Sequence, residues 1–313
     1  MHYAAIDLGA TNLRAIVGDD SATVVGRARA ETPNGSTGED VAGSVVETLR
    51  EACAAADVEP SSIAAAGVGA AGQLDRRRGA VRPVNVRGVE SIPIVGPLTG
   101  LLGTDDVFLH KDTAAAAMGE RFFTAPGVEN LVYLTISSGI GAGVVVDGRV
   151  LAGRDGNVGE VGHVTVDPDG EMTCGCGRAG HWEAYCSGNN IPRYARVLAA
   201  DGAETTLPLE RPDFDARDVF ARADSDPLAA TVLDRVADWN AIGVATIVHA
   251  YAPATLRIGG AVALNNPDRV IGPIRERIDG ALVVDSPEIE AAELGEDAVL
   301  EGALASAITG GTG

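Results

Sequence analysis

The sequence predicts an α/β protein of two domains. Its 313 residues are enough for two domains of ordinary size, each with its own core. Hydrophobic residues make up 46 %, which indicates a folded chain rather than a disordered one. Two similar modules, each a β-hairpin followed by a helix, begin near residues 3 and 131. A duplication of this kind, with a cleft between the halves, suits nucleotide binding at a domain interface.

The individual elements follow from apolar spacing and turn residues. In the first half the pattern predicts strands over 3–8, 13–17, 63–68 and 107–110, with helices over 41–56 and 113–123. In the second half it predicts a hairpin of 131–136 and 143–146, a long helix over 226–251, a strand over 255–258 and a closing helix over 296–308. We expect the first domain to comprise residues 1–112 with the closing helix, about 296–313, and the second to comprise residues 113–295.

The chain is strongly acidic. Its formal net charge is −20, from 44 acidic and 24 basic residues, and Lys111 is the only lysine. Such a surface repels phosphate backbones, so we expect no nucleic-acid partner. Acidic residues spread along the chain, with almost no lysine, are typical of a protein from a high-salt cytoplasm, where the Debye length is about 3 Å at molar salt. A halophilic origin describes habitat rather than chemistry.

Neither a membrane span nor a signal peptide is expected. No run approaches the ~20 uninterrupted apolar residues that a membrane helix needs. The first residues carry no basic region, and an acidic residue stands at position 7. Both observations predict a cytoplasmic protein with no membrane partner.

The first candidate phosphate turn is Asp7-Leu8-Gly9-Ala10-Thr11-Asn12. Gly9 lets the backbone turn tightly, so that successive amides and the Thr11 hydroxyl can point at phosphate oxygens. Asp7, at the end of the strand, could hold Mg²⁺ directly or through water. The motif alone is a weak signal, because D-x-G-x-T also suits an ordinary hairpin turn.

A second candidate turn runs from Thr135 to Gly143, with Ser137, Ser138, Gly139 and Gly141 in its centre. Hydroxyls followed by alternating glycines would form another phosphate cradle, although glycines also favour a merely flexible hairpin. Two such turns more than a hundred residues apart are a stronger signal than either alone. A third nucleotide element is predicted at Gly259-Gly260, where glycines would let an adenine or ribose lie against the backbone.

One motif points elsewhere. Residues 67–72 fit G-x-G-x-x-G, and Glu90 lies about 20 residues further on, as a dinucleotide-binding fingerprint requires. However, the last glycine should open a helix, and the residues that follow, 73–79, are turn-like without apolar period. A dehydrogenase is therefore disfavoured.

The candidate catalytic residue is Asp112, at the junction of a predicted strand and helix. It would accept the proton of a sugar hydroxyl while a γ-phosphoryl group is transferred, a reaction that needs little else beyond positioning and charge neutralisation. The simpler alternative is that Asp112 caps the helix.

A candidate metal site consists of His163, Cys174, Cys176 and His181. Thiolates with imidazoles suit a closed tetrahedral Zn²⁺ site, and the glycines between them allow a tight knuckle. Cys186 is a rival for the fourth place. A structural zinc is favoured over a catalytic one, because no ligand place remains for water.

These motifs fall in the order and spacing of the ROK family (repressor, open reading frame, kinase), which the chain resembles over nearly its whole length, nearest to the family's glucokinases. The most specific stretch is GRDGNVGEVGH, residues 153–163, followed by CGCGRAGHWE, residues 174–183. They resemble the family's G-x-x-G-x-x-G-E-x-G-H signature and its C-x-C-G-x-x-G-C-x-E knuckle. The resemblance implies an actin/Hsp70/hexokinase-like (ribonuclease H-like) two-domain ATPase fold with an interdomain cleft.

The resemblance also implies roles for single residues. Asp112 resembles the family's general base, and its sugar-hydroxyl binders are matched by Asn85, Glu160, His163 and Glu183. His163 would then have two tasks, one ring nitrogen on zinc and the other towards the sugar. Zinc would support the loop that carries Glu160 and Glu183.

Two positions depart from the family. His181 stands where the family usually has cysteine, and zinc accepts either. Lys111 stands where asparagine commonly precedes the catalytic aspartate and helps to hold the sugar. An ammonium group there would stabilise the carboxylate of Asp112 and weaken it as a base, or would meet a phosphate or an acidic sugar. Alternatively, its head points to solvent.

The resemblance implies ATP- and Mg²⁺-dependent phosphorylation of a hexose, by default glucose to glucose 6-phosphate, with N-acetylmannosamine or another sugar next. A homodimer or higher homo-oligomer is expected from family likeness. The rival class is a non-catalytic sugar sensor, since the family includes transcriptional repressors. Those carry a helix-turn-helix segment before the first turn, for which the residues before Asp7 leave no room. A chaperone-like or filament-forming ATPase is disfavoured by the sugar-loop signature.

Overall fold

The computed structural model describes residues 1–83, 86, 88–200 and 202–313. The chain divides into two compact units. Unit 1 comprises Met1–Tyr133, Gly143–Gly159 and Glu296–Gly313, and unit 2 comprises Leu134–Ala142 and Glu160–Gly295. The domain boundary expected after residue 112 stays a prediction.

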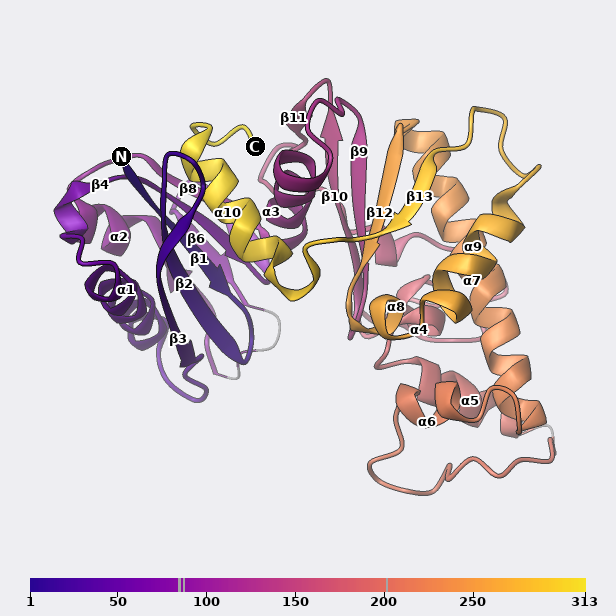
Figure 1. The fold of residues 1–313 in the computed structure, drawn as a ribbon. Helices are drawn as coiled ribbons and strands as arrows, with labels where there is room; N and C mark the ends of the chain where they lie inside the picture. Colours follow the sequence, from indigo (N-terminus) through magenta and orange to yellow (C-terminus); the bar gives the residue numbers. More distant parts are fainter. Residues whose placement is uncertain (84–85, 87, 201) are drawn as a thin grey trace. The chain divides into compact units, whose positions relative to one another are not determined.

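The core of unit 1 is a five-stranded sheet in the order β3-β2-β1-β4-β8 (Figure 1). The first three strands form an antiparallel meander, and β4 and β8 continue the sheet in parallel with β1. The carboxyl ends of β1, β4 and β8 therefore lie at one edge, where ligands bind in open α/β sheets. The strands are β1 (His2–Leu8), β2 (Asn12–Asp19), β3 (Val24–Glu31), β4 (Ile63–Ala70) and β8 (Val107–Lys111).

Helices cover both faces of this sheet (Figure 1). Side chains alternate along β1, so that Ala4 and Ile6 join the core beneath α1 (Gly38–Ala55) and α2 (Val95–Leu102). Ala5 points to the other face and packs with Leu304 of α10 (Ala298–Ile308). This two-sided burial explains why β1 is a continuous apolar run rather than an alternating one.

Helix α10 also packs closely against α3 (Asp112–Gly119). A Cβ atom on Gly302 would lie only 1.7 Å from the carbonyl oxygen of Ala115, so the two backbones approach too closely for a larger residue. The helix expected over 113–123 changes at Glu120 into a π-helical turn, Glu120–Thr124. There the amide of Ala125 donates a hydrogen bond to the carbonyl oxygen of Glu120, and the Thr124 hydroxyl donates to the same oxygen. The closing helix begins at Ala298, after a 3₁₀ turn.

Strand β4 leads into another strand, not into a helix. The three-stranded antiparallel sheet that follows consists of β5 (Gln73–Asp75), β6 (Ala80–Arg82) and β7 (Ile92–Pro93). A dinucleotide-binding turn requires a helix directly after its last glycine. The expectation that residues 67–72 are not such a turn is confirmed.

The second sheet repeats the strand order of the first. Its order is β11-β10-β9-β12-β13. As in the first sheet, the first three strands of the sheet lie side by side in reverse chain order, and two strands from later in the chain follow the first strand. Strand β12 pairs with β13 in parallel. The predicted duplication of a hairpin module is thus confirmed at the level of topology. The strands are β9 (Leu131–Ile136), β10 (Ile140–Val146), β11 (Arg149–Val150), β12 (Thr255–Gly259) and β13 (Glu288–Ala291).

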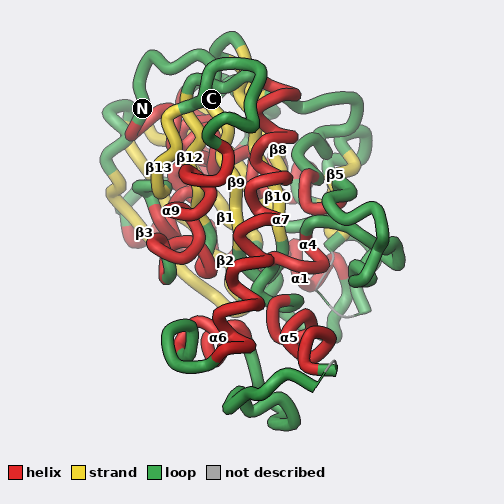
Figure 2. The backbone as a smooth tube through the Cα atoms, turned by 90° about the vertical axis from the view of Figure 1, so that its right-hand side faces the viewer, coloured by secondary structure: helices red, strands yellow, loops and turns green. Residues whose placement is uncertain are grey.

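The helices of unit 2 pack around α7 (Pro227–Tyr251), the long helix predicted from apolar spacing. It contacts α9 (Pro267–Ile278), and α5 (Ile191–Ala199) and α6 (Ala216–Ala221) lie beside it (Figure 2). The short helix α4 (Glu183–Cys186) follows the candidate metal site, and the short helix α8 (Ala261–Asn265) follows β12. Within the described residues, no helix is both long and apolar enough to cross a bilayer.

Candidate active site and metal centre

The first phosphate turn connects β1 to β2 at the sheet edge described above. The amide of Gly9 donates to the carbonyl of Asn12 over 2.9 Å, and the Thr32 hydroxyl donates to the Gly9 carbonyl over 2.8 Å. Thr11 and Asn12 are exposed, and Asn12 Oδ1 accepts a hydrogen bond from Arg29 Nη2. The turn is therefore held by its own backbone and by the Thr32 hydroxyl, with the Thr11 side chain exposed.

Arg14 holds the carboxylate of Asp7. Its Nε and Nη2 atoms donate to Asp7 Oδ2 over 3.1 and 2.7 Å, and its Nη1 atom donates to Asp297 Oδ1 over 2.7 Å. Burial raises the pKa of Asp7 above its ordinary value, and the hydrogen bonds from Arg14 partly offset this effect. Arg14 was not predicted as a functional residue. The signal was present, because a hairpin turn at 9–11 pairs position 7 with position 14.

Asp112 begins α3 directly after β8, at the same edge of the sheet as the first turn. Its Oδ1 atom accepts a hydrogen bond from the Thr113 amide over 2.8 Å. The helix-capping position itself is taken by Lys111, whose side chain makes no capping bond. Asp112 thus lies in the first turn of the helix, where the helix dipole favours a carboxylate.

Lys111 is 7 % exposed. The alternative that its head points to solvent is therefore wrong. A buried ammonium group requires polar or anionic company, and Lys111 lies one residue before Asp112.

The second phosphate turn connects β9 to β10. The amide of Ser137 donates to the Gly139 carbonyl over 2.9 Å, and the amide of Gly188 donates to the Ser137 carbonyl over 2.7 Å. Gly141 lies inside β10 rather than in the turn. Gly143 serves packing in unit 1, because a Cβ atom there would lie 1.9 Å from the Thr113 carbonyl oxygen. Of the glycines expected to form the cradle, Gly139 is the one in the turn itself.

The third nucleotide element lies close to the second turn. Strand β12 ends at Gly259, and Gly260 has φ +87°. A Cβ atom on Gly260 would lie 2.5 Å from the Ile136 carbonyl oxygen and 2.6 Å from Thr135 Oγ1. The two glycine-containing segments therefore meet at the ends of β9 and β12, within unit 2.

The four predicted metal ligands form one cluster. The ligand atoms of His163, Cys174, Cys176 and His181 all lie within 4.8 Å of one another. Cys174 Sγ lies 3.6 Å from His163 Nδ1, and Cys176 Sγ lies 3.3 Å from His181 Nδ1. Cys186 is outside the cluster, with its buried thiol donating to the Val236 carbonyl. The rival for the fourth place is thus excluded, and two thiols with two imidazoles suit a tetrahedral zinc ion.

The knuckle has a scaffold of its own. Cys174 and Arg178 close its turn by a 2.8 Å backbone hydrogen bond. Gly180 has φ +76°, and a Cβ atom there would lie 2.0 Å from the Asp167 carbonyl oxygen. The Tyr185 hydroxyl donates to Asp167 Oδ2 and accepts from the Met172 amide. These contacts hold the loop that carries the cysteine and histidine side chains.

The expected sugar-binding residues of unit 2 gather around this cluster. His163 directs Nδ1 to Cys174, while its Nε2 atom lies 3.6 Å from Glu160 Oε2. Glu183 Oε2 accepts a hydrogen bond from the Ile140 amide over 2.9 Å, and its Oε1 atom lies 3.9 Å from Cys174 Sγ. Asn85, the remaining expected sugar binder, lies outside the described residues.

The two repeated sheets, each with a turn after its first strand, define an ATPase fold of the actin/Hsp70/hexokinase type. The family model "ROK family" matches residues 3–309. The chain belongs to the ROK family.

Relatives with known sequences and solved structures are consistent with this family assignment. The glucokinase of Pyrobaculum calidifontis is 37 % identical over 306 residues, covering 97 % of this chain and 94 % of that protein. The glucokinase of Thermotoga maritima is 33 % identical over 307 residues, covering 95 % and 94 %. The ROK hexokinase structure from Thermus thermophilus has a TM-score of 0.84 at 35 % identity, covering 99 % and 98 %. A ROK glucokinase from Streptomyces griseus, solved with glucose and AMPPNP, has a TM-score of 0.76 at 29 % identity, covering 99 % and 100 %.

Proposed function

We propose that this chain is an ATP-dependent kinase that converts glucose to glucose 6-phosphate. The observation that carries the proposal is the repeated sheet with its two phosphate turns, in a chain similar over nearly its full length to glucokinases. The Streptomyces griseus relative was solved with glucose and an ATP analogue, which supports the same pair of substrates here.

In this proposal Asp112 is the general base. The attacking sugar oxygen forms a bond to the γ-phosphorus, its proton passes to the Asp112 carboxylate, and the bond from the γ-phosphorus to the bridging oxygen breaks to release ADP. The position of Asp112 at the carboxyl end of β8 supports this role. Closure over the sugar would exclude water and limit ATP hydrolysis.

The phosphates would be held by the two turns. Thr11 and Asn12 would act in unit 1, and Ser137, Ser138 and Gly139 would act in unit 2, while Gly141 lies inside β10. Gly259 and Gly260 would lie along the adenosine. Because Arg14 occupies Oδ2 of Asp7, we infer that Asp7 acts on Mg²⁺ through Oδ1 or through a bound water. When bound, Mg²⁺ would neutralise charge on the phosphates.

The sugar hydroxyls would be held by Asn85, Glu160, His163 and Glu183. The His163 Nε2 atom lies 3.6 Å from Glu160 Oε2, which supports a shared hydroxyl site for these two residues. Lys111, buried beside Asp112, would donate to a sugar oxygen where the family commonly has asparagine.

The cluster of two thiols and two imidazoles fits a structural zinc ion, which would fix the loops that carry Glu160 and Glu183. Metal analysis of the purified protein tests this. We expect about one zinc per chain, lost in Cys174→Ser and Cys176→Ser and kept in Cys186→Ser, whose thiol lies outside the cluster. Equal zinc content in all three variants would contradict the assignment.

The test of the function is a coupled ATPase assay across a panel of sugars in concentrated potassium chloride. We expect turnover with glucose. The panel includes N-acetylmannosamine, because an N-acetylmannosamine kinase of Citrobacter koseri is 37 % identical over 226 residues, covering 71 % of this chain. Measurable sugar binding without turnover of any sugar would contradict the proposed kinase activity and favour a non-catalytic sugar sensor. We expect a cytoplasmic homodimer or higher homo-oligomer, and light scattering on the purified protein measures the number of subunits.

A further inference from the structure

An arginine-rich cavity lies in unit 1, and none of the residues that line it is assigned above to ATP, sugar or zinc. It has a volume of about 590 Å³, within the range of small-molecule sites. Its lining comes from the β5–β6 hairpin and from the loop after β11: Gln73, Leu74, Asp75, Arg76, Arg77, Arg82, Arg154, Asp155 and Asn157.

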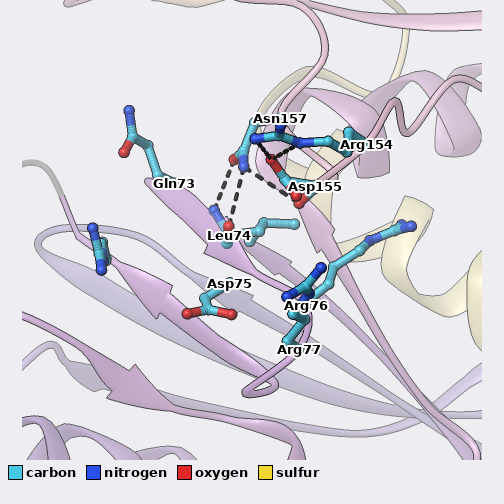
Figure 3. A pocket seen from close by; sticks show the side chains of 9 residues that line it. Gln73, Leu74, Asp75, Arg76, Arg77, Arg154, Asp155 and Asn157 are labelled. Atoms are coloured by element: carbon cyan, nitrogen blue, oxygen red, sulfur yellow. Dashed lines mark hydrogen bonds and ion pairs between the residues drawn. The ribbon is translucent and has the colours of Figure 1, made fainter.

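Asn157 joins the two walls of this cavity. Its Oδ1 atom accepts from the Leu74 amide over 2.7 Å, and its Nδ2 atom donates to the Leu74 carbonyl over 3.0 Å (Figure 3). The side chain thus pairs with β5 as a neighbouring strand would. Gly156, with φ +83°, leaves room for Arg76, because a Cβ atom there would lie 2.9 Å from Arg76 Nε. These contacts make the cavity a built feature rather than a chance gap between loops.

The charge of the cavity opposes that of the chain. Four arginines and two aspartates line it, in a protein of formal net charge −20. Arg154 pairs with Asp155 over 2.9 Å. For Arg76, Arg77 and Arg82, by contrast, the described residues supply no carboxylate within ion-pair distance. Three exposed guanidinium groups around one cavity leave their donors available to a ligand.

The hairpin extends this basic surface. Arg76, Arg77 and Arg78 are consecutive at its tip, and the same three residues line a second cavity of about 520 Å³ on the side of β8. The guanidinium fork matches phosphate oxygens in pairs, and charge-assisted hydrogen bonds of this kind are the strong ones. A ligand that bears several negative charges would satisfy more than one arginine at once.

We propose that this arginine-lined cavity is a binding site for a phosphate-bearing small molecule, either a sugar phosphate or a short chain of linked phosphates. The site is separate from the proposed phosphate turns, whose residues do not line it. Binding there does not depend on kinase activity, so failure of the proposed function leaves the test unaffected.

The experiment is a calorimetric titration of the full chain with glucose 6-phosphate, tripolyphosphate and inorganic phosphate, with citrate as a charged probe without phosphorus. The variant Arg77→Gln/Arg82→Gln removes two cavity arginines. The matched control, Arg50→Gln/Arg149→Gln, removes two exposed arginines of unit 1 that do not line the cavity. Any binding at the proposed phosphate turns is shared by the wild type and both variants, so it cancels in the comparison.

We expect at least one phosphate probe to bind the cavity variant about tenfold more weakly than it binds the wild type and the control. Preference for glucose 6-phosphate would identify a sugar phosphate as the source of the anion, and preference for tripolyphosphate a phosphate chain. If the cavity variant and the control bind every probe equally well, the proposal of a binding site in this cavity is wrong. An equal loss for citrate would overturn the assignment to phosphate.

The variant Arg77→Lys/Arg82→Lys guards against lost structure. It retains both charges, and we expect its affinity to recover to within about threefold of the wild type, since part of the energy comes from the paired geometry of the guanidinium group. Failure to recover would mean that the glutamine variant lost structure rather than recognition, and would remove the support for the site.

Discussion

Glu183 accepts a hydrogen bond from the backbone amide of Ile140, with 2.9 Å between Oε2 and the nitrogen. Ile140 directly follows the second candidate phosphate turn, and Glu183 is the second residue after His181, a proposed metal ligand. Gly139 leaves the space for this contact, because a Cβ atom there would lie 2.8 Å from the same oxygen. One carboxylate therefore links the cysteine–histidine cluster to the second candidate phosphate turn within unit 2.

This link predicts that Glu183 affects the KM for ATP as well as for sugar. Glu183→Ala leaves the Ile140 amide without its acceptor, and we expect the KM for ATP to rise about tenfold. Glu183→Gln keeps an oxygen that can accept the bond and should stay near the wild-type KM for ATP. Glu160→Ala is the matched control, since Glu160 is an exposed glutamate that is also proposed to bind the sugar. A rise in the KM for ATP of the same size in Glu160→Ala would contradict the specific link.

The pair of Arg14 and Asp7 predicts a coupled effect on stability. The Asp7 side chain is 14 % exposed, and Arg14→Ala would leave its carboxylate without the guanidinium group. We expect the free energy of unfolding to fall by roughly 2–4 kcal/mol. Denaturant titration of both single variants and the Asp7→Asn/Arg14→Ala double variant measures the coupling. Strictly additive effects would show that the two side chains do not interact energetically.

The knuckle depends on the packing of Trp182 against α7. Trp182 is fully buried, its Nε1 atom donates to Asn240 Oδ1 over 2.9 Å, and a Cβ atom on Gly243 would lie 2.3 Å from the indole. We expect Gly243→Ala to destabilise the protein by about 1–3 kcal/mol, because the added methyl group overpacks this contact.

The matched control for Gly243→Ala is Gly43→Ala. Gly43 is exposed inside α1 and has open space around its missing Cβ atom, so alanine should stabilise the helix by about 0.5–1 kcal/mol. Thermal unfolding of the two variants measures whether each substitution lowers or raises the stability of the protein. A Gly243→Ala variant as stable as Gly43→Ala would contradict the close packing.

Asp226 predicts a loss of stability in acid. It caps α7 at Ala229 and accepts hydrogen bonds from Thr205 and Thr206. Burial raises the pKa of Asp226, but these hydrogen bonds outweigh burial and lower it to about 2. A lowered pKa in the folded state stabilises the protein above the ordinary value near 4, and this stabilisation is lost as pH falls towards 2.

We therefore expect the wild type to lose about 2 kcal/mol more than Asp226→Asn between pH 5 and pH 2. Urea titrations at a series of pH values measure the difference, and they cancel the acid sensitivity that both proteins share. Curves of stability against pH that run parallel for the two proteins would contradict the account of this cap.

The sequence indicated the fold through local patterns and the site through motifs. The hairpin at residues 3–17 and the helix over 226–251 follow from spacing, and the structure contains both. The four proposed metal ligands also follow from spacing, and the structure brings them into one cluster. Contacts between distant segments were not predictable in this way. Glu183 and Ile140 are 43 residues apart, and Asn157 and Leu74 are 83 apart, so no periodicity relates them. Their geometry depends on how the sheets and loops pack.

Lys111 shows how a motif can be recognised while its environment is not. The resemblance marked the residue as a departure from asparagine. It did not indicate that Lys111, at the end of the edge strand β8, would be buried. Side-chain burial at a strand end depends on tertiary packing that single residues do not encode.

The account depends most directly on Asp112 as the general base. The decisive measurement is the formation of glucose 6-phosphate by Asp112→Asn, with ATP and glucose at saturating concentrations. Asparagine keeps the size of the side chain but cannot accept the proton, so we expect the turnover to fall by about 10²–10⁴-fold, while zinc content and the unfolding temperature stay unchanged. Turnover like that of the wild type would contradict the account.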